Sequence, residues 1–303
     1  MNPGILITGG AGLLAANWAA GVAHSFDVTL GLHARRISMG GVACRVVNLE
    51  LADSVETAIK EANAAVVIHC AAMTNVDACE VAPEDARYVN VEIARNVALA
   101  CEMRGAKLVH ISTDHVFSGA KSMMSETAAI GPINVYAQTK ADGEVAVLEA
   151  CPSAIVARTN FFGWGLPYRR SFSDTIVDTL RAGEEIGLFR DAFFTPILMN
   201  RLIESVHKLI EADVVGVFHI AGDERLSKYE FGLRIARTFD LDAELIKPIL
   251  LAERRDLAPR PLDLSLDNHK MRAVIGHGIG DVDDQLKWLK GQERQRPQLD
   301  KMR

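Results

Sequence analysis

The glycine-rich segment TGGAG at residues 8–12 constrains the fold of this chain more than any other feature. It follows a short apolar run, Gly4–Thr8, and leads into a run of small residues typical of a closely packed helix. In a strand–turn–helix of this kind Gly9 permits the tight turn, Gly12 lets the backbone approach a pyrophosphate, and Ala15 packs the helix on the strand. The segment therefore predicts a dinucleotide-binding turn, and a turn without a ligand is the alternative.

The first half of the chain alternates short β-branched runs with helical patterns. Continuous apolar strands separated by helices are typical of a parallel sheet that is covered on both faces. We therefore predict an α/β fold built on a doubly wound parallel sheet of the Rossmann type. The predicted strands are Gly4–Thr8, Asp27–Leu32, Cys44–Val47, Ala65–His69, Lys107–Ile111 and Ala154–Ala157, and the predicted helices are Gly12–Val22, Ala52–Ala62, Pro83–Met103 and Tyr136–Ala150.

The end of the second predicted strand indicates which dinucleotide binds. NAD-binding folds place an acidic residue there, about 20 residues beyond the glycines. This chain has no acidic residue from position 28 to 49, and it carries Arg35 and Arg36 instead. Two guanidinium groups favour the 2′-phosphate of NADP, although two solvated surface arginines would give the same pattern. By analogy, Asn48 and Leu49 after the third strand are expected beside the adenine.

Small and polar residues follow the fourth and fifth predicted strands. Ligands of such sheets bind at the carboxyl ends of the strands, so Ala71 and Ala72 are expected against the ribose and nicotinamide of the cofactor. Thr113 is expected to hydrogen-bond a substrate oxygen, with Ser112 as the alternative hydroxyl. Asn90, inside the long helix, either holds the backbone near this site or is an ordinary helical asparagine.

Tyr136 and Lys140 are spaced four residues apart in YAQTK, which places them on one face of a helix. An ammonium group can lower the pKa of a nearby phenol, and the phenol can exchange a proton with a carbonyl oxygen. The pair alone is weak evidence because the spacing arises by chance. It becomes informative here because a dinucleotide turn precedes it in the chain.

Taken together, the motifs resemble a known family. The glycine loop, the Ala71-Ala72 pair, STDHVF at residues 112–117, YAQTK at 136–140 and RPLDLSLD at 260–267 are similar to the extended short-chain dehydrogenase/reductases, and most of all to the dTDP-4-dehydrorhamnose reductase family. The resemblance extends to about residue 290. It implies Tyr136 as the general acid, Lys140 as the residue that lowers the pKa of Tyr136 and contacts the ribose, and Thr113 as the hydroxyl that orients the carbonyl.

The resemblance also implies NADP(H) as the cofactor and reduction of a 4-keto (6-deoxy) nucleotide sugar as the reaction. The expected cofactor contacts are Gly9, Gly12, Leu13, Leu14, Arg35, Arg36, Asn48, Leu49, Cys70, Ala71, Ala72, Thr74, Tyr136 and Lys140. The expected substrate contacts are Thr74, Thr113, Asp114, His115, Asn160, Phe161, Trp164 and Arg260. No metal site is predicted.

Two departures from the family pattern leave the identity of the sugar open. Reductases of this family usually have Tyr where this chain has His115, and FFGWGLPY at residues 161–168 is not their usual sequence. Phe161 and Trp164 could equally stack on a nucleotide base or line the core between domains.

Two other functions remain as alternatives. A dehydratase or epimerase is the first. Related dehydratases have Asp-Glu where this chain has Asp114-His115, so the missing Glu weakens this alternative, whereas Asp114 keeps an acid/base group in reach. A non-catalytic NADP-binding subunit is the second, because the regulatory subunit of methionine adenosyltransferase resembles the same family.

The regular alternation ends near residue 160. We predict a dinucleotide-binding domain at 1–160, a mainly substrate-binding, smaller C-terminal domain at 161–290 with segments around 195–220 returning to the sheet, and a frayed polar tail at 291–303. In this half the predicted elements are a loop at Phe161–Arg170, helices at Ser171–Ala182, Arg201–Ala212, Ser227–Phe239, Asp267–Ile275 and Asp281–Lys290, and a strand at Val217–Ile220.

Composition limits the class of protein. The 303 residues are 49% hydrophobic and carry a formal charge of −6, which is typical of a globular protein and gives no basic surface for nucleic acid. Five cysteines without metal-type spacing predict reduced thiols, and no secretory leader or membrane-length apolar run is recognisable. The expected location is cytoplasmic and the expected partner is a nucleotide sugar, with no nucleic acid or membrane. A homodimer is compatible with these features.

Overall fold

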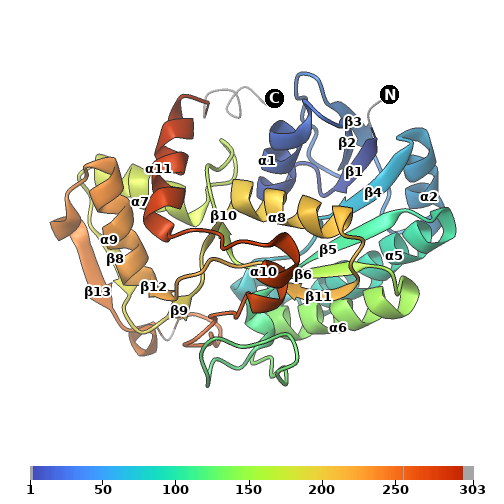
Figure 1. The fold of residues 1–303 in the computed structure, drawn as a ribbon. Helices are drawn as coiled ribbons and strands as arrows, with labels where there is room; N and C mark the ends of the chain where they lie inside the picture. The colour runs from blue at the N-terminus through green and yellow to red at the C-terminus, as the bar shows by residue number, and fades with distance from the viewer. Residues whose placement is uncertain (1–2, 255, 296–303) are drawn as a thin grey trace.

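The computed structural model describes residues 3–254 and 256–295, and a seven-stranded sheet forms its centre (Figure 1). The strand order is β11-β6-β5-β4-β1-β2-β3, and every neighbouring pair runs parallel. The predicted doubly wound parallel sheet is therefore confirmed. The strands are β1 Gly4–Thr8, β2 Asp27–Leu32, β3 Ala43–Val46, β4 Ala64–His69, β5 Lys107–Thr113, β6 Ile155–Thr159 and β11 Gly216–His219.

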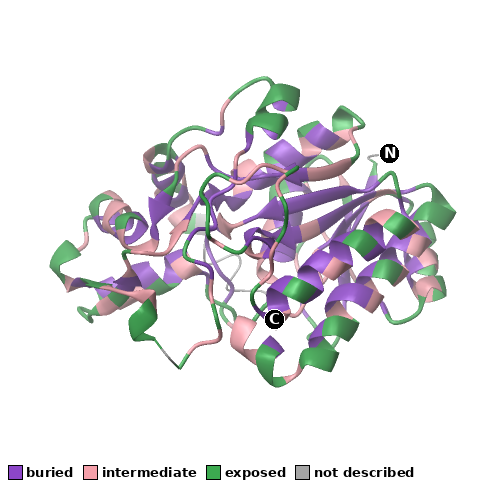
Figure 2. Cartoon of the chain, turned by 90° about the horizontal axis from the view of Figure 1, so that it is seen from below, coloured by how far each residue is buried: buried purple, intermediate pink, exposed green. Residues whose placement is uncertain are grey.

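Helices cover both faces of the sheet because its central strands are apolar on both sides; all five residues of β1 and of β6 are buried. One face packs against α1 Leu13–Val22, α8 Met199–Glu211 and α10 His269–Ile275. The other face packs against α2 Ala52–Glu61, α5 Ile93–Arg104 and α6 Val135–Ala150. Figure 2 shows the buried strands enclosed between these layers.

The direction in which the sheet grows reverses between β1 and β4. From β1 the chain adds β2 and β3 on one side, and from β4 it adds β5 and β6 on the other. Crossover connections therefore diverge at the carboxyl ends of β1 and β4 and leave a crevice there, which is where ligands of open α/β sheets bind.

The long helix predicted at Pro83–Met103 is interrupted. It consists of α4 Pro83–Arg87, a π-helical turn Tyr88–Glu92 and then α5. A further helix, α3 Val76–Val81, precedes it and was not predicted, because six residues make too few turns to display a helical period.

The C-terminal part has a core of its own, formed by Phe162, Trp164, Phe231 and neighbouring apolar side chains. Its elements are α7 Phe172–Arg181, β8 Ile186–Phe189, α9 Lys228–Phe239, β13 Ile246–Ile249 and α11 Val282–Gly291. The predicted loop at Phe161–Arg170 contains the two-residue strand β7 Phe161–Phe162, which pairs with β10 Ile197–Leu198. Another short pair joins β9 Phe193–Phe194 to β12 Leu226–Ser227.

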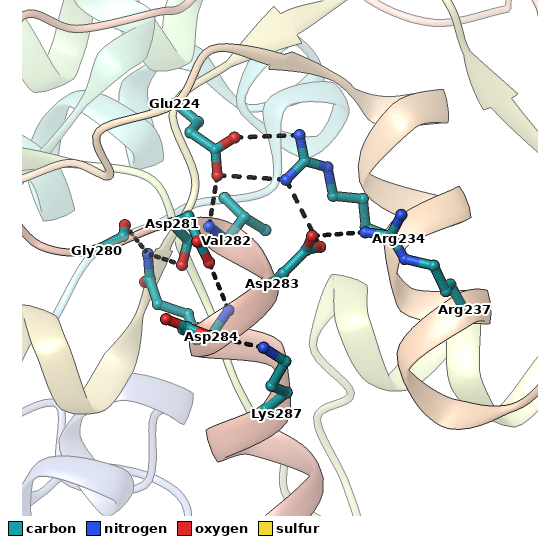
Figure 3. Close-up of polar contacts among 10 residues, drawn as sticks. Glu224, Arg234, Arg237, Gly280, Asp281, Val282, Asp283, Asp284 and Lys287 are labelled. Atoms are coloured by element: carbon teal, nitrogen blue, oxygen red, sulfur yellow. Dashed lines mark hydrogen bonds and ion pairs between the residues drawn. The ribbon is translucent and has the colours of Figure 1, made fainter.

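An ion network fixes α11 against α9 (Figure 3). The Glu224 carboxylate accepts hydrogen bonds from the Val282 N–H at 2.6 Å and pairs with Arg234 at 3.1 Å. Arg234 and Arg237 both pair with Asp283, at 3.6 and 2.5 Å. Because these side chains are partly exposed, the network orients the helices more than it stabilises them.

The C-terminal tail and the domain division are the remaining predictions about the organisation of the chain. Residues 292–295 form a 3-10 turn after α11, and the rest of the predicted tail lies outside the described residues. The domain division at residue 160 stays a prediction, although β11 does return to the sheet. None of the described helices is long and apolar enough to cross a membrane.

Candidate active site

A cavity of about 1050 Å³ opens at the carboxyl ends of β1, β4, β5 and β6, at the point where the strand order reverses. Its walls come from the glycine loop, the start of α1, the ends of β2 and β4, the first turns of α6, and the segment at residues 168–172. The sheet therefore brings segments that are far apart in the sequence to one place.

The glycine loop has the geometry that the sequence predicted. Gly9 has φ +68°, and a Cβ atom there would stand 2.7 Å from the backbone nitrogen of Ala71. The N–H of Gly12 donates to the Gly9 carbonyl at 2.7 Å, and Gly12 is the N-cap of α1. Leu13 and Leu14 follow in the first turn and line the cavity. N–H groups of a first turn have no intrahelical acceptor, so this wall of the cavity favours an anion.

The two arginines after β2 differ in their position relative to the cavity. Arg35 lines the cavity, whereas Arg36 is exposed and is not among the lining residues. The predicted adenine contacts divide in the same way. Leu49 lines the cavity, while the Asn48 side chain accepts a hydrogen bond from the Glu50 N–H at 3.0 Å and lies outside it. Arg35 and Leu49 therefore lie where a ligand in the cavity could contact them, and cofactor contacts of Arg36 and Asn48 stay predictions.

The segment after β4 forms the floor of the cavity. Cys70, Ala71, Ala72 and Thr74 all line it, as expected. Burial raises the pKa of the Cys70 thiol to about 12, which makes this cysteine an inert wall and not a nucleophile.

The side chain of Asn90 in the π turn hydrogen-bonds the segment after β4. Its amide oxygen accepts from the Met73 N–H at 2.9 Å, and its amide nitrogen donates to the Met73 carbonyl at 3.1 Å and to the Thr139 hydroxyl at 3.0 Å. Of its two predicted roles, the one that holds the backbone near the site is confirmed.

Tyr136 stands in the first turn of α6 and lines the cavity, although only 8% of it is exposed. The Asn134 side chain caps this turn by accepting from the Ala137 N–H at 2.8 Å. Burial raises the pKa of Tyr136, and a hydrogen bond with Thr113 partly opposes that rise. The net direction is opposite to the lowering expected from Lys140, because removal of the phenol from water outweighs the Thr113 hydrogen bond and Lys140 does not contribute to the shift.

Lys140 lies one turn further along α6, and its ammonium is buried beneath the cavity. Its Nζ donates to the Ile111 carbonyl at 2.8 Å and lies 3.2 Å from Nε2 of His110. Burial lowers the pKa of Lys140 to about 8, and the Glu144 carboxylate opposes this shift. Two protein acceptors therefore orient the ammonium and leave one N–H for a ligand.

Thr113 and Ser112 are distinguished by their partners. The Ser112 hydroxyl donates to Glu144 Oε1 at 2.5 Å, and Glu144 in turn pairs with Arg158 at 2.7 Å in the interior. The Thr113 hydroxyl donates to Asp114 at 3.2 Å and lies on the Tyr136 side of the cavity. Thr113 is thus the better placed of the two hydroxyls to meet a ligand.

Four more of the predicted substrate residues line the cavity near Thr113 and Tyr136: Asp114, His115, Asn160 and Phe161. The Asp114 carboxylate accepts from the Asn160 amide at 2.6 Å. The His115 ring stands edge-on to Tyr136, with 5.5 Å between ring centroids, and its Nδ1 has no hydrogen-bond partner within the described part of the chain. Burial lowers the pKa of His115, so the ring is neutral near pH 7.

Two predicted substrate residues do not line the cavity. Trp164 is 3% exposed, packs in the C-terminal core, and its indole N–H donates to the Leu289 carbonyl at 2.9 Å. Arg260 pairs with Asp77 at 2.8 Å and joins the C-terminal part to α3. Trp164 therefore has the core role, and Arg260 stabilises the contact between the two parts of the chain.

Tyr168, Arg169 and Phe172 are among the lining residues that were not predicted. Tyr168 ends the stretch at residues 161–168 that departs from the family pattern, and Arg169 and Phe172 follow it. The richness of residues 161–170 in aromatic side chains, glycine and arginine was the available signal. The Arg169 guanidinium donates to the Thr74 hydroxyl at 2.8 Å, and the Tyr168 hydroxyl donates to the Ala11 carbonyl at 3.2 Å. This segment thus crosses from the C-terminal part to the glycine loop.

The chain is similar to known proteins in both sequence and structure. The profile of the family described as the RmlD substrate binding domain matches residues 1–289. A crystal structure of dTDP-4-dehydrorhamnose reductase from Bacillus anthracis in complex with NADP superposes with a TM-score of 0.85 at 26% identity, over 96% of this chain and 100% of that one.

Two curated relatives are similar over most of the chain. The "probable low-salt glycan biosynthesis reductase Agl14" of Haloferax volcanii is 31% identical over 250 residues, which are 80% of this chain and 83% of the relative. Methionine adenosyltransferase 2 subunit beta of Mus musculus is 30% identical over 285 residues, which are 91% of this chain and 83% of the relative.

Proposed function

Because the chain belongs to the RmlD substrate binding domain family, we propose that it is an NADPH-dependent reductase of a 4-keto-6-deoxy nucleotide sugar. The protein is an NADP-dependent oxidoreductase of the short-chain dehydrogenase/reductase type. The observation that carries the finer proposal is that Thr113, Tyr136 and Lys140 line the same cavity as the glycine loop.

The residues on the cofactor side fit a dinucleotide with a phosphorylated ribose. A Cβ atom at Gly9 would collide with the backbone of the β4 end, so that space is kept narrow and free of side chains. The start of α1 suits a pyrophosphate, and Arg35 suits the 2′-phosphate. When bound, NADPH supplies the hydride that reduces the keto carbon.

The protein residues supply and position the proton. A raised pKa keeps Tyr136 protonated near pH 7, and a neutral phenol is the form that can donate to the alkoxide oxygen. Thr113 holds the same oxygen by a hydrogen bond, and the remaining N–H of Lys140 contacts the ribose of the cofactor. The Asp114–Asn160 pair and His115 then face the sugar.

The test is NADPH oxidation against a panel of keto nucleotide sugars, with product masses measured in parallel. A reductase consumes one NADPH for each sugar and adds about two daltons to its mass, because one hydride and one proton are transferred. NADH with the same panel is the control. Absence of turnover with every 4-keto-6-deoxy nucleotide sugar would contradict the proposal.

A dehydratase is the second candidate, and the partly buried His115 beside Asp114 in the cavity favours it specifically. Dehydration needs extra acid and base groups, and these two residues could provide them. The same mass measurement separates the reactions. A loss of about 18 daltons from a 4-hydroxy nucleotide hexose, without net consumption of cofactor, would identify a dehydratase.

The mouse relative, a subunit of methionine adenosyltransferase 2, suggests a binding role as the third candidate. The presence of Thr113, Tyr136 and Lys140 around one cavity supports catalysis instead. Tight NADPH binding without turnover of any sugar, together with co-purification of a larger synthetase, would favour the binding role.

A further inference from the structure

The segment at residues 165–171, called the strap below, is anchored at both ends and reaches the cofactor side of the cavity. Leu166 and Arg169 exchange two backbone hydrogen bonds, of 2.9 and 3.0 Å, which close a tight turn around Pro167 and Tyr168. The fully buried Leu166 packs in the core beneath the sheet. At the other end, Ser171 caps α7 through a capping box with Asp174. The turn therefore holds Tyr168 in a defined position.

Tyr168 contacts two parts of the cofactor side at once. Its hydroxyl donates to the Ala11 carbonyl in the glycine loop at 3.2 Å. Its ring supports Arg35, whose guanidinium carbon lies 4.2 Å from the ring centroid. A cation over an aromatic face is attracted by the ring quadrupole, and the planar guanidinium keeps its N–H donors directed around its edge.

The surroundings of Arg35 leave those donors available. Within residues 3–254 and 256–295, no carboxylate forms an ion pair with Arg35, so the Tyr168 ring is its main support. An exposed arginine normally loses side-chain entropy when it is fixed on a ligand. The Tyr168 ring already holds the guanidinium, so less side-chain entropy is lost when a ligand binds. This strengthens the binding of the ligand group that Arg35 contacts.

We infer that Tyr168 is a cofactor-selectivity residue, which positions Arg35 for the 2′-phosphate of the cofactor ribose. The inference rests on the proposed use of NADPH. The selectivity for a phosphorylated ribose then comes from two distant segments, the end of β2 and the strap after β6, and not from the strand end alone. The chemical group that is recognised is a phosphate monoester on ribose.

The test is a set of dissociation constants for NADPH and NADH, measured by titration calorimetry without substrate. In the unmodified chain we expect NADPH to bind about ten- to a hundredfold more tightly. Tyr168→Leu removes the aromatic face and is expected to weaken NADPH about five- to tenfold, with NADH changed by less than about twofold. Tyr168→Phe keeps the face and is expected to retain the preference for NADPH.

A double-mutant comparison tests whether the effect acts through Arg35. Arg35→Ala should remove most of the preference, and addition of Tyr168→Leu should then weaken NADPH no further. Arg36→Ala is the matched control, since this exposed arginine does not line the cavity. The Arg36→Ala variant should keep the preference for NADPH over NADH.

The outcomes separate the inference from the proposal on which it rests. Equal binding of both cofactors by the unmodified chain would overturn the NADPH proposal, and this inference with it. A preserved preference in Tyr168→Leu, or an equal loss for both cofactors, would overturn the inference alone, because Tyr168 would then be a general wall of the cavity. Additive effects of Tyr168→Leu and Arg35→Ala would also overturn it.

Discussion

At the scale of single residues, the burial of Tyr136 determines the protonation state of its hydroxyl. A phenol in water has a pKa near 10, and burial in this cavity moves the value up, so the group is a proton donor throughout the neutral range. Reduction of a carbonyl needs such a donor, whereas oxidation of an alcohol needs the phenolate. Tyr136 is therefore in the protonated form that carbonyl reduction would require.

Removal of this hydroxyl gives the first prediction. Tyr136→Phe should lower turnover by roughly 10²–10⁴-fold, because the alkoxide loses its proton donor while the ring still fills its place. NADPH affinity should stay within about twofold of the unmodified value, since the hydroxyl is directed at the substrate and the shape is kept. Steady-state kinetics on the best substrate and calorimetry with NADPH measure the two effects.

Tyr229→Phe is the matched control, because it removes a phenol hydroxyl that packs against the C-terminal core and does not line the cavity. It should leave turnover unchanged. Full activity of Tyr136→Phe would exclude Tyr136 as the proton donor.

The site residues that sequence could place are those fixed by a strand end or a helix face. Thr113 and Tyr136 are of this kind, because a parallel sheet delivers all its carboxyl ends to one edge. Arg36, Asn48 and Trp164 do not line the cavity, since the direction of a side chain in a loop depends on long-range packing and not on local period. Tyr168 was missed for the same reason.

At the scale of elements, the contact between α6 and the π turn positions the helix that carries Tyr136 and Lys140. A Cβ atom at Gly143 would stand 2.3 Å from the Asn90 carbonyl oxygen, so the absence of a side chain there lets the two backbones approach. Asn90 also hydrogen-bonds Thr139 on α6. The π turn, α6 and the segment after β4 thus form one unit, which holds Tyr136 and Lys140 against the floor of the cavity.

A methyl group at this contact gives the second prediction. Gly143→Ala should lower the free energy of unfolding by roughly 1–3 kcal/mol, because α6 must move away from the π turn. Turnover should fall as well, since α6 carries both Tyr136 and Lys140. Urea unfolding and steady-state kinetics measure the two effects.

Gly21→Ala in α1 is the matched control. The nearest atom to a Cβ atom there is Ile203 Cδ1 at 3.9 Å, which is an ordinary contact. Alanine in place of a helical glycine should then raise stability by up to about 1 kcal/mol. A Gly143→Ala variant as stable as the Gly21→Ala variant would show that the close approach is not important.

Elements with a strong local period were predictable, and those created by distant contacts were not. The predicted strands and helices around the sheet lie within two residues of the observed ones, apart from the interrupted helix at Pro83–Met103. The strands of two residues, β7, β9, β10 and β12, are too short to have a pattern of their own. These strands form because packing of the C-terminal core places two distant segments side by side. The local sequence of either segment does not indicate this pairing.

At the scale of the whole molecule, three histidines are buried within the sheet: His69 on β4, His110 on β5 and His219 on β11. Burial lowers the pKa of His69 to about 3 and that of His219 to about 4, and it lowers that of His110 well below the usual value. Nearby cations act in the same direction, namely Lys140 on His69 and His110, and Arg158 on His219. The folded protein therefore keeps all three rings neutral through the mildly acidic range.

This arrangement gives the third prediction, a loss of stability in mild acid. A histidine in the unfolded chain has a pKa near 6.5, so between pH 6.5 and the folded-state pKa the unfolded state binds more protons than the folded state. Stability is then fully present above pH 6.5 and falls as the pH falls. From pH 7 to pH 5, each buried histidine should contribute a loss on the order of 1–2 kcal/mol to the free energy of unfolding.

The measurement is urea unfolding of the unmodified protein, His69→Gln and His24→Gln at pH 7 and pH 5. Glutamine can keep the hydrogen bond that joins His69 to the Thr8 hydroxyl at 2.7 Å, but it cannot take up a proton. The difference in stability between the two pH values should therefore shrink on the order of 1–2 kcal/mol in His69→Gln, whatever its stability at pH 7. His24 is exposed, so its variant should reproduce the unmodified difference. If all three proteins lost the same stability between pH 7 and pH 5, the acid sensitivity would arise from groups other than His69.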